Sequence, residues 1–205
     1  SAATHSPSDE VYCGPGPSSE LEVQAIESLF TAHNICAAIS WHTYEELVLW
    51  PYGYANVQTP DNTYMAQIGT HIASLIHRQT GGGTYTPEQS VGLYPTTGDL
   101  LDWLYGYSYY ELGHPCLCYT IEAGQSFQPS QSYLDQICAE NARGGFYLLT
   151  EAANISLLTQ RPTRPTIDPL PINDTGTYTL HWHIANPACS PDQYQLNELT
   201  GLTLQ

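Results

Sequence analysis

Apolar positions recur every three to four residues in several segments, which is the spacing of one helix face. Val23, Ile26 and Phe30 form such a stripe after Ser19, and Ser19 and Glu22 have the spacing of a capping box. This pattern predicts a helix that begins near residue 20. The same kind of spacing predicts further helices over residues 61–78, 99–109, 130–141 and 145–159.

Two continuous apolar runs of strand length, residues 36–42 and 117–122, lie between the predicted helices. Strands that alternate with helices form sheets with helices packed on their faces, so we expect two buried strands of an α/β fold. The runs end at His42 and Glu122, and open α/β sheets bind ligands at strand ends. A buried carboxylate there is paired or functional. The alternative is that His42 hydrogen-bonds within the core and Glu122 pairs with an arginine.

The composition changes after residue 160, where the chain becomes rich in proline. We therefore expect a first domain over residues 1–160, a semi-rigid linker over 161–175 and a β-rich module over 176–205. β-branched and aromatic residues predict strands at 177–185 and 194–204 in that module. Two strands do not make a stable domain, so this is expected to be part of a β-sandwich-like module.

The charge balance restricts the possible partners. Twenty acidic residues stand against four arginines, with no lysine, and the formal net charge is -16. Such a charge argues against nucleic acid or an anionic membrane surface as a partner. No apolar run is long enough to predict a membrane span. The acidity suits an extracellular protein, or one whose substrate carries some positive charge.

Cysteines and two sequons indicate the secretory route. The chain has six cysteines, and Asn154 and Asn173 each begin an Asn-x-Ser/Thr triplet. We expect a secreted glycoprotein with disulfides, whose pairing the sequence leaves open. His181 and His183 would share one strand face and could form a metal pair, although surface-facing alternation explains them more simply.

Four segments, in order, resemble the zinc metallocarboxypeptidases over roughly residues 10–158. Residues 12–15 resemble the lead-in to a helix of that family, and residues 40–54 (SWHTYEELVLWPYGY) resemble the segment with its third zinc ligand. Tyr94 with residues 97–106 resembles the specificity loop. Residues 119–124, followed by 127–129, resemble the strand that bears the catalytic glutamate. The resemblance implies an α/β fold: half of a mixed, twisted sheet flanked by helices, followed by the start of a small β module.

The resemblance also implies catalytic roles. His42 would bind one zinc ion through its neutral imidazole. Glu122 would be the general base for the water that zinc activates, and would then deliver the proton to the leaving amine. Tyr94 would close over the substrate and help to exclude water.

Four further residues are implied in substrate binding. Leu101 stands where the A-type enzymes carry an aliphatic residue, which favours an apolar or aromatic C-terminal side chain. Asp99 matches an acidic position of the bacterial T-type enzymes, which also accept basic residues. Thr120 and Gly53 would line the same pocket. We therefore expect broad specificity with an apolar preference.

The resemblance has a gap at its upstream end. The family's other two zinc ligands, a His-x-x-Glu pair, belong upstream of the matched segments, as do its substrate-binding arginines. His42 and Glu45 also spell His-x-x-Glu, but in the third-ligand context, so Glu45 is expected in an exposed strand end or loop. Because catalytic zinc takes about three protein ligands, this chain alone is expected to be inactive.

Two hypotheses about function follow. In the first, the chain is part of an exopeptidase whose partners are the N-terminal half of the same catalytic domain and the C-termini of peptides or proteins. In the second, it is a non-catalytic extracellular binding or assembly module that retains the fold.

Overall fold

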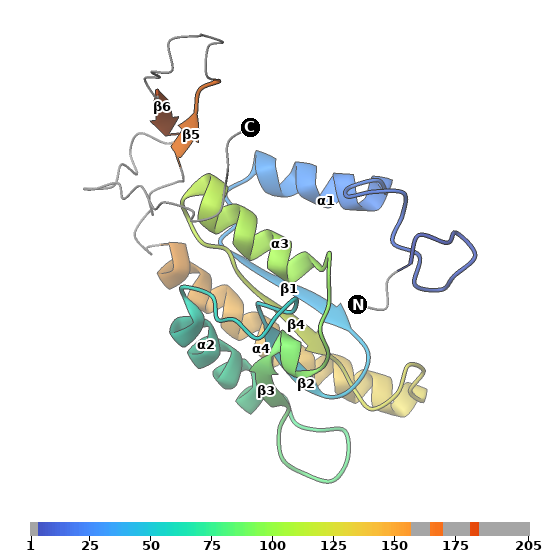
Figure 1. Ribbon diagram of the computed structural model, residues 1–205. Coiled ribbons are helices and arrows are strands. Elements are labelled where there is room, and N and C mark those ends of the chain that lie inside the picture. Colours follow the sequence, from blue (N-terminus) through green and yellow to red (C-terminus); the bar gives the residue numbers. More distant parts are fainter. Residues whose placement is uncertain (1–3, 157–164, 170–180, 185–205) are drawn as a thin grey trace, which may run out of the picture.

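The computed structural model describes residues 4–156, 165–169 and 181–184. Their main feature is a mixed sheet of four strands between helices (Figure 1). The elements of this unit are α1 (Leu21–Ala32), β1 (Ala37–His42), β2 (Leu47–Trp50), α2 (Asn62–Leu75), β3 (Thr86–Gln89), η1 (Ser90–Gly92), α3 (Leu100–Tyr107), η2 (Ser108–Leu112), β4 (Leu117–Glu122) and α4 (Gln131–Ser156).

The strand order is β1-β4-β2-β3. β1 and β4 are parallel, with Ala37 opposite Leu117 and His42 opposite Glu122. β2 runs antiparallel to β4 and parallel to β3. Helices α1 and α3 lie on one face of the sheet, and α2 and α4 lie on the other (Figure 1). The predicted class, a mixed sheet flanked by helices, is confirmed.

β4 is buried along its whole length because it lies between two other strands and between the helix layers. Its Tyr119 hydroxyl donates a hydrogen bond to the Met65 carbonyl at 3.1 Å, which fixes β4 against α2. β1, by contrast, ends the sheet and is only half-buried. The expectation that residues 36–42 form a buried strand is therefore met only in part, because β1 is half-buried at Ala37–Ser40 and exposed at Trp41 and His42.

The prediction of separate helices at 130–141 and 145–159 is wrong, since α4 is continuous through Gly144 and Gly145. A Cβ on Gly144 would lie 2.9 Å from side-chain carbons of Ile72 and Ile76. The glycine is thus the point at which α4 approaches α2 closely, and the close packing offsets the weak helix propensity of glycine.

One other local prediction is wrong, and two strands were not predicted. The capping box is absent: Glu20 is the N-cap of α1 without a side-chain cap, and the Ser19 hydroxyl instead donates to the Glu20 carboxylate. β2 and β3 were not predicted as strands, because runs of four residues are too short for a clear period.

A second, two-stranded sheet pairs β5 (Pro165–Ile167) antiparallel with β6 (Trp182–Ile184). β5 falls inside the segment expected to be a linker, and β6 falls inside the strand expected at 177–185. The strand expected at 194–204 and the rest of the 176–205 module lie outside the described residues.

The cysteines of the described residues are all free thiols: Cys13, Cys36, Cys116, Cys118 and Cys138. Cys189 and the sequon at Asn173 lie outside the described residues. Asn154 is exposed on α4, where its amide donates to the Glu151 carboxylate. No helix among the described residues is long and apolar enough to cross a membrane.

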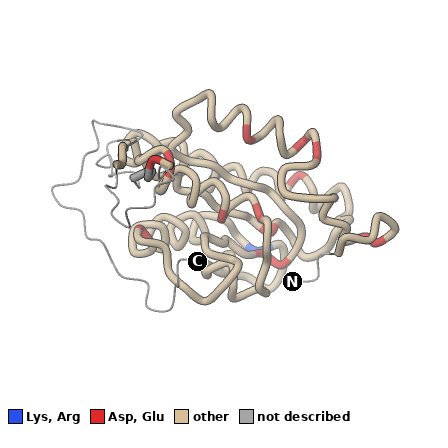
Figure 2. Tube along the Cα trace, turned by 45° about the horizontal axis from the view of Figure 1, so that its top comes forward, with Lys and Arg blue, Asp and Glu red and all other residues tan. Residues whose placement is uncertain are grey.

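Acidic positions are distributed over much of the described trace, whereas basic positions are few (Figure 2). The arginines of the described residues are Arg78 and Arg143. Both form ion pairs with glutamates, Arg78 with Glu46 and Arg143 with Glu140. Glu122 is therefore not the carboxylate that pairs with either of them.

Candidate active site

His42 and Glu122 are opposite each other at the ends of adjacent parallel strands. Both are the last residues of their strands, so they lie at the carboxyl edge of the parallel pair, where open α/β sheets bind ligands. The backbone continues the pairing by one residue, because the Ala123 N–H donates to the His42 carbonyl at 2.9 Å. The sheet thus holds an imidazole and a carboxylate together without help from a loop.

Glu122 is only 8% exposed. Within the described part of the chain, no group donates a hydrogen bond to its carboxylate. Burial raises the pKa of Glu122, the nearby His42 lowers it and the charge of Glu45 raises it again, with a net upward shift. A buried carboxylate without a hydrogen-bond partner is costly to a fold, and such groups cluster at functional sites.

His42 is exposed, and its Nε2 lies 3.0 Å from the Ser40 hydroxyl oxygen. Ser40 precedes it by two residues on the same strand, so both side chains are on the same face of the sheet. An accessible imidazole beside an unpaired carboxylate can ligate a metal, bind a carboxylate, or transfer a proton.

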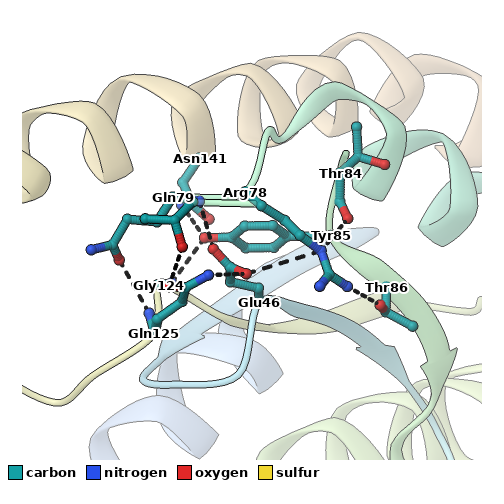
Figure 3. Close-up of polar contacts among 10 residues, drawn as sticks. Glu46, Arg78, Gln79, Thr84, Tyr85, Thr86, Gly124, Gln125 and Asn141 are labelled. Atoms are coloured by element: carbon teal, nitrogen blue, oxygen red, sulfur yellow. Dashed lines mark hydrogen bonds and ion pairs between the residues drawn. The ribbon is translucent and has the colours of Figure 1, made fainter. Parts of the chain in front are cut away.

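The loop that follows Glu122 is fixed by Glu46, a buried carboxylate at the start of β2 (Figure 3). One Glu46 oxygen accepts the backbone N–H of Gln79 at 2.6 Å, and the other accepts the Gln125 amide at 2.9 Å. The Arg78 guanidinium lies 4.0 Å from the second oxygen. Glu46 thereby joins β2, the segment after α2 and the loop after β4.

Tyr85 holds the same loop through its hydroxyl group (Figure 3). Its hydroxyl accepts the Gly124 N–H at 2.9 Å and the Asn141 amide at 3.2 Å. Gly124 has a positive φ of 73°, a conformation that favours glycine. The chain therefore turns away from the sheet two residues after Glu122, and hydrogen bonds with Glu45, Gln79 and Tyr85 hold that turn.

A second cluster of carboxylates lies around Gly53. Asp102 accepts the Gly53 N–H at 2.9 and 3.1 Å and the Tyr54 N–H at 3.0 Å. Asp99 is the N-cap of α3 and accepts both the Asp102 N–H and the Thr96 hydroxyl. A Cβ on Gly53 would lie 2.7 Å from an Asp99 oxygen, so Gly53 and Asp99 are neighbours in the structure.

The remaining predicted site residues are Leu101, Thr120 and Tyr94. Leu101 is buried on α3, where its carbonyl accepts the Cys118 thiol of β4 at 3.2 Å. Thr120 is on β4, two residues before Glu122 and on the same face of the sheet. Tyr94 is 59% exposed in the loop after η1, and its hydroxyl has no hydrogen bond among the described residues. Among the described residues, no hydrogen bond joins Tyr94 to His42.

The residues present fit a zinc ion only in part. His42 can supply one imidazole ligand, and Glu122 lies beside it as an unpaired carboxylate. The described segments contain no group of three or more His, Cys, Asp and Glu side chains that could hold a metal. Because catalytic zinc takes about three protein ligands, the other ligands would have to come from elsewhere.

Two further predictions concern the possible metal pair of His181 and His183, and the position of Glu45. His183 pairs with Asp168, Nδ1 to Oδ1 at 3.1 Å, rather than with His181. Glu45 is exposed in the loop between β1 and β2, as expected, and its N–H donates to the Gly124 carbonyl. Among the described residues, His183 therefore contacts Asp168 and Glu45 bonds to Gly124, and neither has a hydrogen bond to His42.

Sequence reasoning missed Glu46 and Asp102. Glu46 adjoins Glu45 in the sequence, and nothing local distinguishes the buried glutamate from the exposed one. Asp102 follows Asp99 by one helical turn, and burial raises its pKa despite the backbone N–H donors from Gly53 and Tyr54. A carboxylate in the first turn of a helix is an ordinary stabilising feature, so its second role could not be predicted.

Comparison with known proteins gives a consistent result. A family model described as zinc carboxypeptidase matches residues 1–144. Carboxypeptidase A1 of Rattus norvegicus is 34% identical over 104 residues, 50% of this chain and 25% of that protein. Carboxypeptidase A6 of Mus musculus is 36% identical over 107 residues, 51% of this chain and 24% of that protein.

Solved structures have the same fold. Bovine thrombin-activatable fibrinolysis inhibitor, in complex with tick carboxypeptidase inhibitor, superposes with a TM-score of 0.61 and 23% identity. The match covers 74% of this chain and 52% of that one. The chain thus spans about a quarter of the length of the curated relatives and about half of this structure. The family match over residues 1–144 shows that the chain belongs to the zinc carboxypeptidase family.

Proposed function

We propose that this chain is part of a zinc-dependent exopeptidase that removes C-terminal residues from peptides. The observation that carries the proposal is the register of His42 and Glu122 at the carboxyl edge of β1 and β4. Family membership supports a peptidase, and the unpaired Glu122 carboxylate supports a base at this edge.

In this proposal, His42 is one zinc ligand and binds as a neutral imidazole. Zinc would supply Lewis-acid chemistry, polarising the scissile carbonyl and making water more acidic. Glu122 accepts the proton of the attacking water and transfers it to the nitrogen of the leaving amine. The upward shift of its pKa suits this task, since a general base works best when its pKa is nearer the working pH.

The second cluster would bind the C-terminal side chain of the substrate. Leu101 of α3 is buried two positions after Asp99 and would be the apolar residue of this pocket. Both Asp99 oxygens already accept hydrogen bonds from the chain itself, which weakens its attraction for a basic side chain. We therefore propose an apolar preference. Tyr94, exposed on a loop, would close over the bound peptide.

The remaining zinc ligands would come from the N-terminal half of the catalytic domain, outside the 205 residues. We also place the protein outside the cell, on the charge of -16 and the exposed sequon at Asn154. The second candidate is a non-catalytic binding or assembly module. The lack of a three-ligand group in the described residues favours it.

The test uses the full-length protein and N-blocked dipeptides that end in Phe or Arg. We expect chelator-sensitive release of the C-terminal residue, faster for Phe. Glu122→Gln should lower kcat by about 10²–10⁴-fold. Glu10→Gln, at an exposed position near the N-terminus, is the matched control and should leave kcat unchanged. No release by the wild type with zinc supplied would reject the exopeptidase and favour the non-catalytic module, whereas equal activity in Glu122→Gln and the wild type would reject Glu122 as the base.

A further inference from the structure

We propose that Cys36 and Cys116 are a redox-active pair, which a small dialkyl disulfide such as oxidised glutathione converts into a disulfide between β1 and β4. The bond would join the two strands at the ends opposite His42 and Glu122. The proposal does not rest on the proposed function, because it concerns only two free thiols and the sheet that holds them.

The two cysteines stand side by side, immediately before their strands. β1 begins at Ala37 and β4 at Leu117, and these residues are register partners in a parallel pair. The Leu117 N–H donates to the Cys36 carbonyl at 2.9 Å, so the pairing already reaches Cys36. Neighbouring strands lie about 4.8 Å apart, within the range of Cα separations, about 4.4–6.8 Å, that disulfides span. The bond therefore needs no large movement of the backbone.

The electrostatics of the two thiols also indicate that they are close. Burial and, to a smaller extent, the charge of Cys36 raise the pKa of the Cys116 thiol to about 12. A charge has such an effect only on a group near it. The Cys36 thiol donates to the Ala152 carbonyl of α4 at 3.5 Å. Because a thiol is a weak donor, a rotation about χ1 exchanges this contact for the Cys116 sulfur at little cost.

Cys118 is a poorer partner for Cys116, although the two are close in sequence. It lies two residues further along the same strand, which at about 3.3 Å per residue is about 6.6 Å. The Cβ atoms of a disulfide are only about 3.5–4.5 Å apart. The Cys118 thiol also donates to the Leu101 carbonyl of α3 at 3.2 Å. Cys118 is therefore expected to stay reduced.

The exposed thiols of the described residues lie away from the pair. Cys138 is near the start of α4, fourteen residues before the Ala152 that Cys36 contacts. At about 1.5 Å per helical residue, the two positions are about 21 Å apart. The Cys13 thiol donates to the Thr4 carbonyl within the N-terminal segment. Among the described cysteines, Cys116 is thus the one that the fold brings to Cys36.

The two thiols differ in exposure, and this difference sets the order of the reaction. Cys36 is half-buried and lines a groove of about 550 Å³, whereas Cys116 is fully buried. Cys36 therefore reacts first. Its thiolate attacks one sulfur of oxidised glutathione and expels one glutathione thiolate, which takes up a proton. The product is a mixed disulfide between Cys36 and glutathione.

The Cys116 thiol completes the exchange. It loses its proton to water, and its thiolate attacks the Cys36 sulfur and expels the second glutathione, which takes up a proton. The two protein sulfurs together lose two electrons and two protons, and one oxidised glutathione becomes two thiols. Because burial raises the pKa of Cys116, this second step is the slow one.

The bond would stabilise the sheet. It closes a loop of about eighty residues that contains β2, α2, β3 and α3. A disulfide that closes a long loop stabilises a fold mainly by restricting the unfolded chain. It also fixes β1, which ends the described sheet, to the fully buried β4 (Figure 1). Oxidation should therefore raise the Tm of the full-length protein by about 5 °C or more.

Peptide mapping of the full-length protein by mass spectrometry tests the pairing. The reduced protein is incubated with oxidised glutathione at about pH 8, remaining thiols are alkylated, and peptic peptides are mapped without reduction. We expect one pair of peptides joined through Cys36 and Cys116, with Cys118 alkylated. Alkylation of both Cys36 and Cys116 would overturn the proposal. A lasting glutathione adduct on Cys36, or a bond from Cys36 to any other cysteine, Cys189 included, would also overturn it.

A pH series and two variants test the role of each thiol. Once Cys36 carries glutathione, its release should accelerate about tenfold per pH unit between about pH 7 and 9, because the Cys116 thiolate is the nucleophile. A rate that does not change with pH would exclude Cys116 from that step. Cys36→Ser should abolish the bond and the rise in Tm, whereas Cys118→Ser, the matched control, should keep both. An equal rise in Tm in Cys36→Ser would contradict a link between β1 and β4.

Discussion

His42 and Glu122 face each other as the last register pair of two parallel strands. Neither side chain depends on a flexible loop for its place, and the hydrogen bond from Ala123 to the His42 carbonyl fixes the strand ends to each other. Sites on strands hold their side chains more accurately than sites on loops. Tyr94, by contrast, lies on an exposed loop.

Glu46 should be important for stability. Its two oxygens accept the Gln79 N–H and the Gln125 amide inside the fold. Glu46→Ala leaves these donors without that acceptor, so we expect the free energy of unfolding to fall by about 1–3 kcal/mol. Urea denaturation followed by tryptophan fluorescence measures the change.

Glu45→Ala is the control for that experiment. Glu45 is exposed, and like Glu46 it has a positive φ, so both substitutions leave the backbone strain in place. We expect a change within about 0.5 kcal/mol for Glu45→Ala. Equal losses in the two variants would mean that the turn, and not the buried carboxylate, determines stability.

Two helical glycines should respond oppositely to alanine. A Cβ on Gly69 of α2 would lie 2.8 Å from the Trp50 ring and 3.2 Å from the Tyr119 ring, so Gly69→Ala should cost about 1–3 kcal/mol. A Cβ on Gly106 of α3 would meet nothing within 4 Å. Gly106→Ala should therefore stabilise by up to about 1 kcal/mol. Calorimetric Tm values that fall for both variants would contradict this account of α3.

The contact between α2 and α4 should depend on pH. Burial raises the pKa of Glu140, but hydrogen bonds from His77 and the charge of Arg143 outweigh it and lower the pKa below 4.5. The unfolded state therefore binds the proton more readily. The stabilisation that the Glu140 carboxylate provides is present above its pKa in the unfolded state. It is lost as the pH falls through its lower pKa in the folded state. Glu140→Gln should cost about 1 kcal/mol at pH 7, because both partners are half-exposed and screened.

The difference between Glu140→Gln and the wild type should shrink as the pH falls through the lowered pKa of Glu140 in the folded state. Denaturation curves at pH 7, 5, 4 and 3 follow it, and Glu10→Gln, which is exposed, should match the wild type throughout. A constant difference down to pH 3 would show that the ionised carboxylate is not the cause.

Local patterns were enough to predict some elements and not others. α2 was predictable because Met65, Ile68 and Ile72 repeat at helical spacing over fourteen residues. β4 was predictable because its apolar run is continuous. β2 and β3 have only four residues each, and no period is visible over that length. The two helices expected at 130–141 and 145–159 are one helix, α4, whose Gly144 contacts Ile72 and Ile76, about seventy residues earlier.

The candidate site shows the same limit. His42 and Glu122 could be singled out because each ends an apolar run. Glu46 could not, because its burial depends on Gln125, which is 79 residues away in the sequence. Asp102 could not, because its Gly53 partner is 49 residues away. Contacts of that range are set by the sheet topology and leave no mark on the local sequence.

The most direct test of the central claim is the zinc content of the full-length protein, by elemental analysis with matched protein quantification. We expect about one zinc per chain in the wild type and in Glu122→Gln, and less than about a tenth of that in His42→Ala, since losing one of about three ligands weakens the site severely. No zinc in the wild type after adding it back, or full occupancy in His42→Ala, would contradict the account.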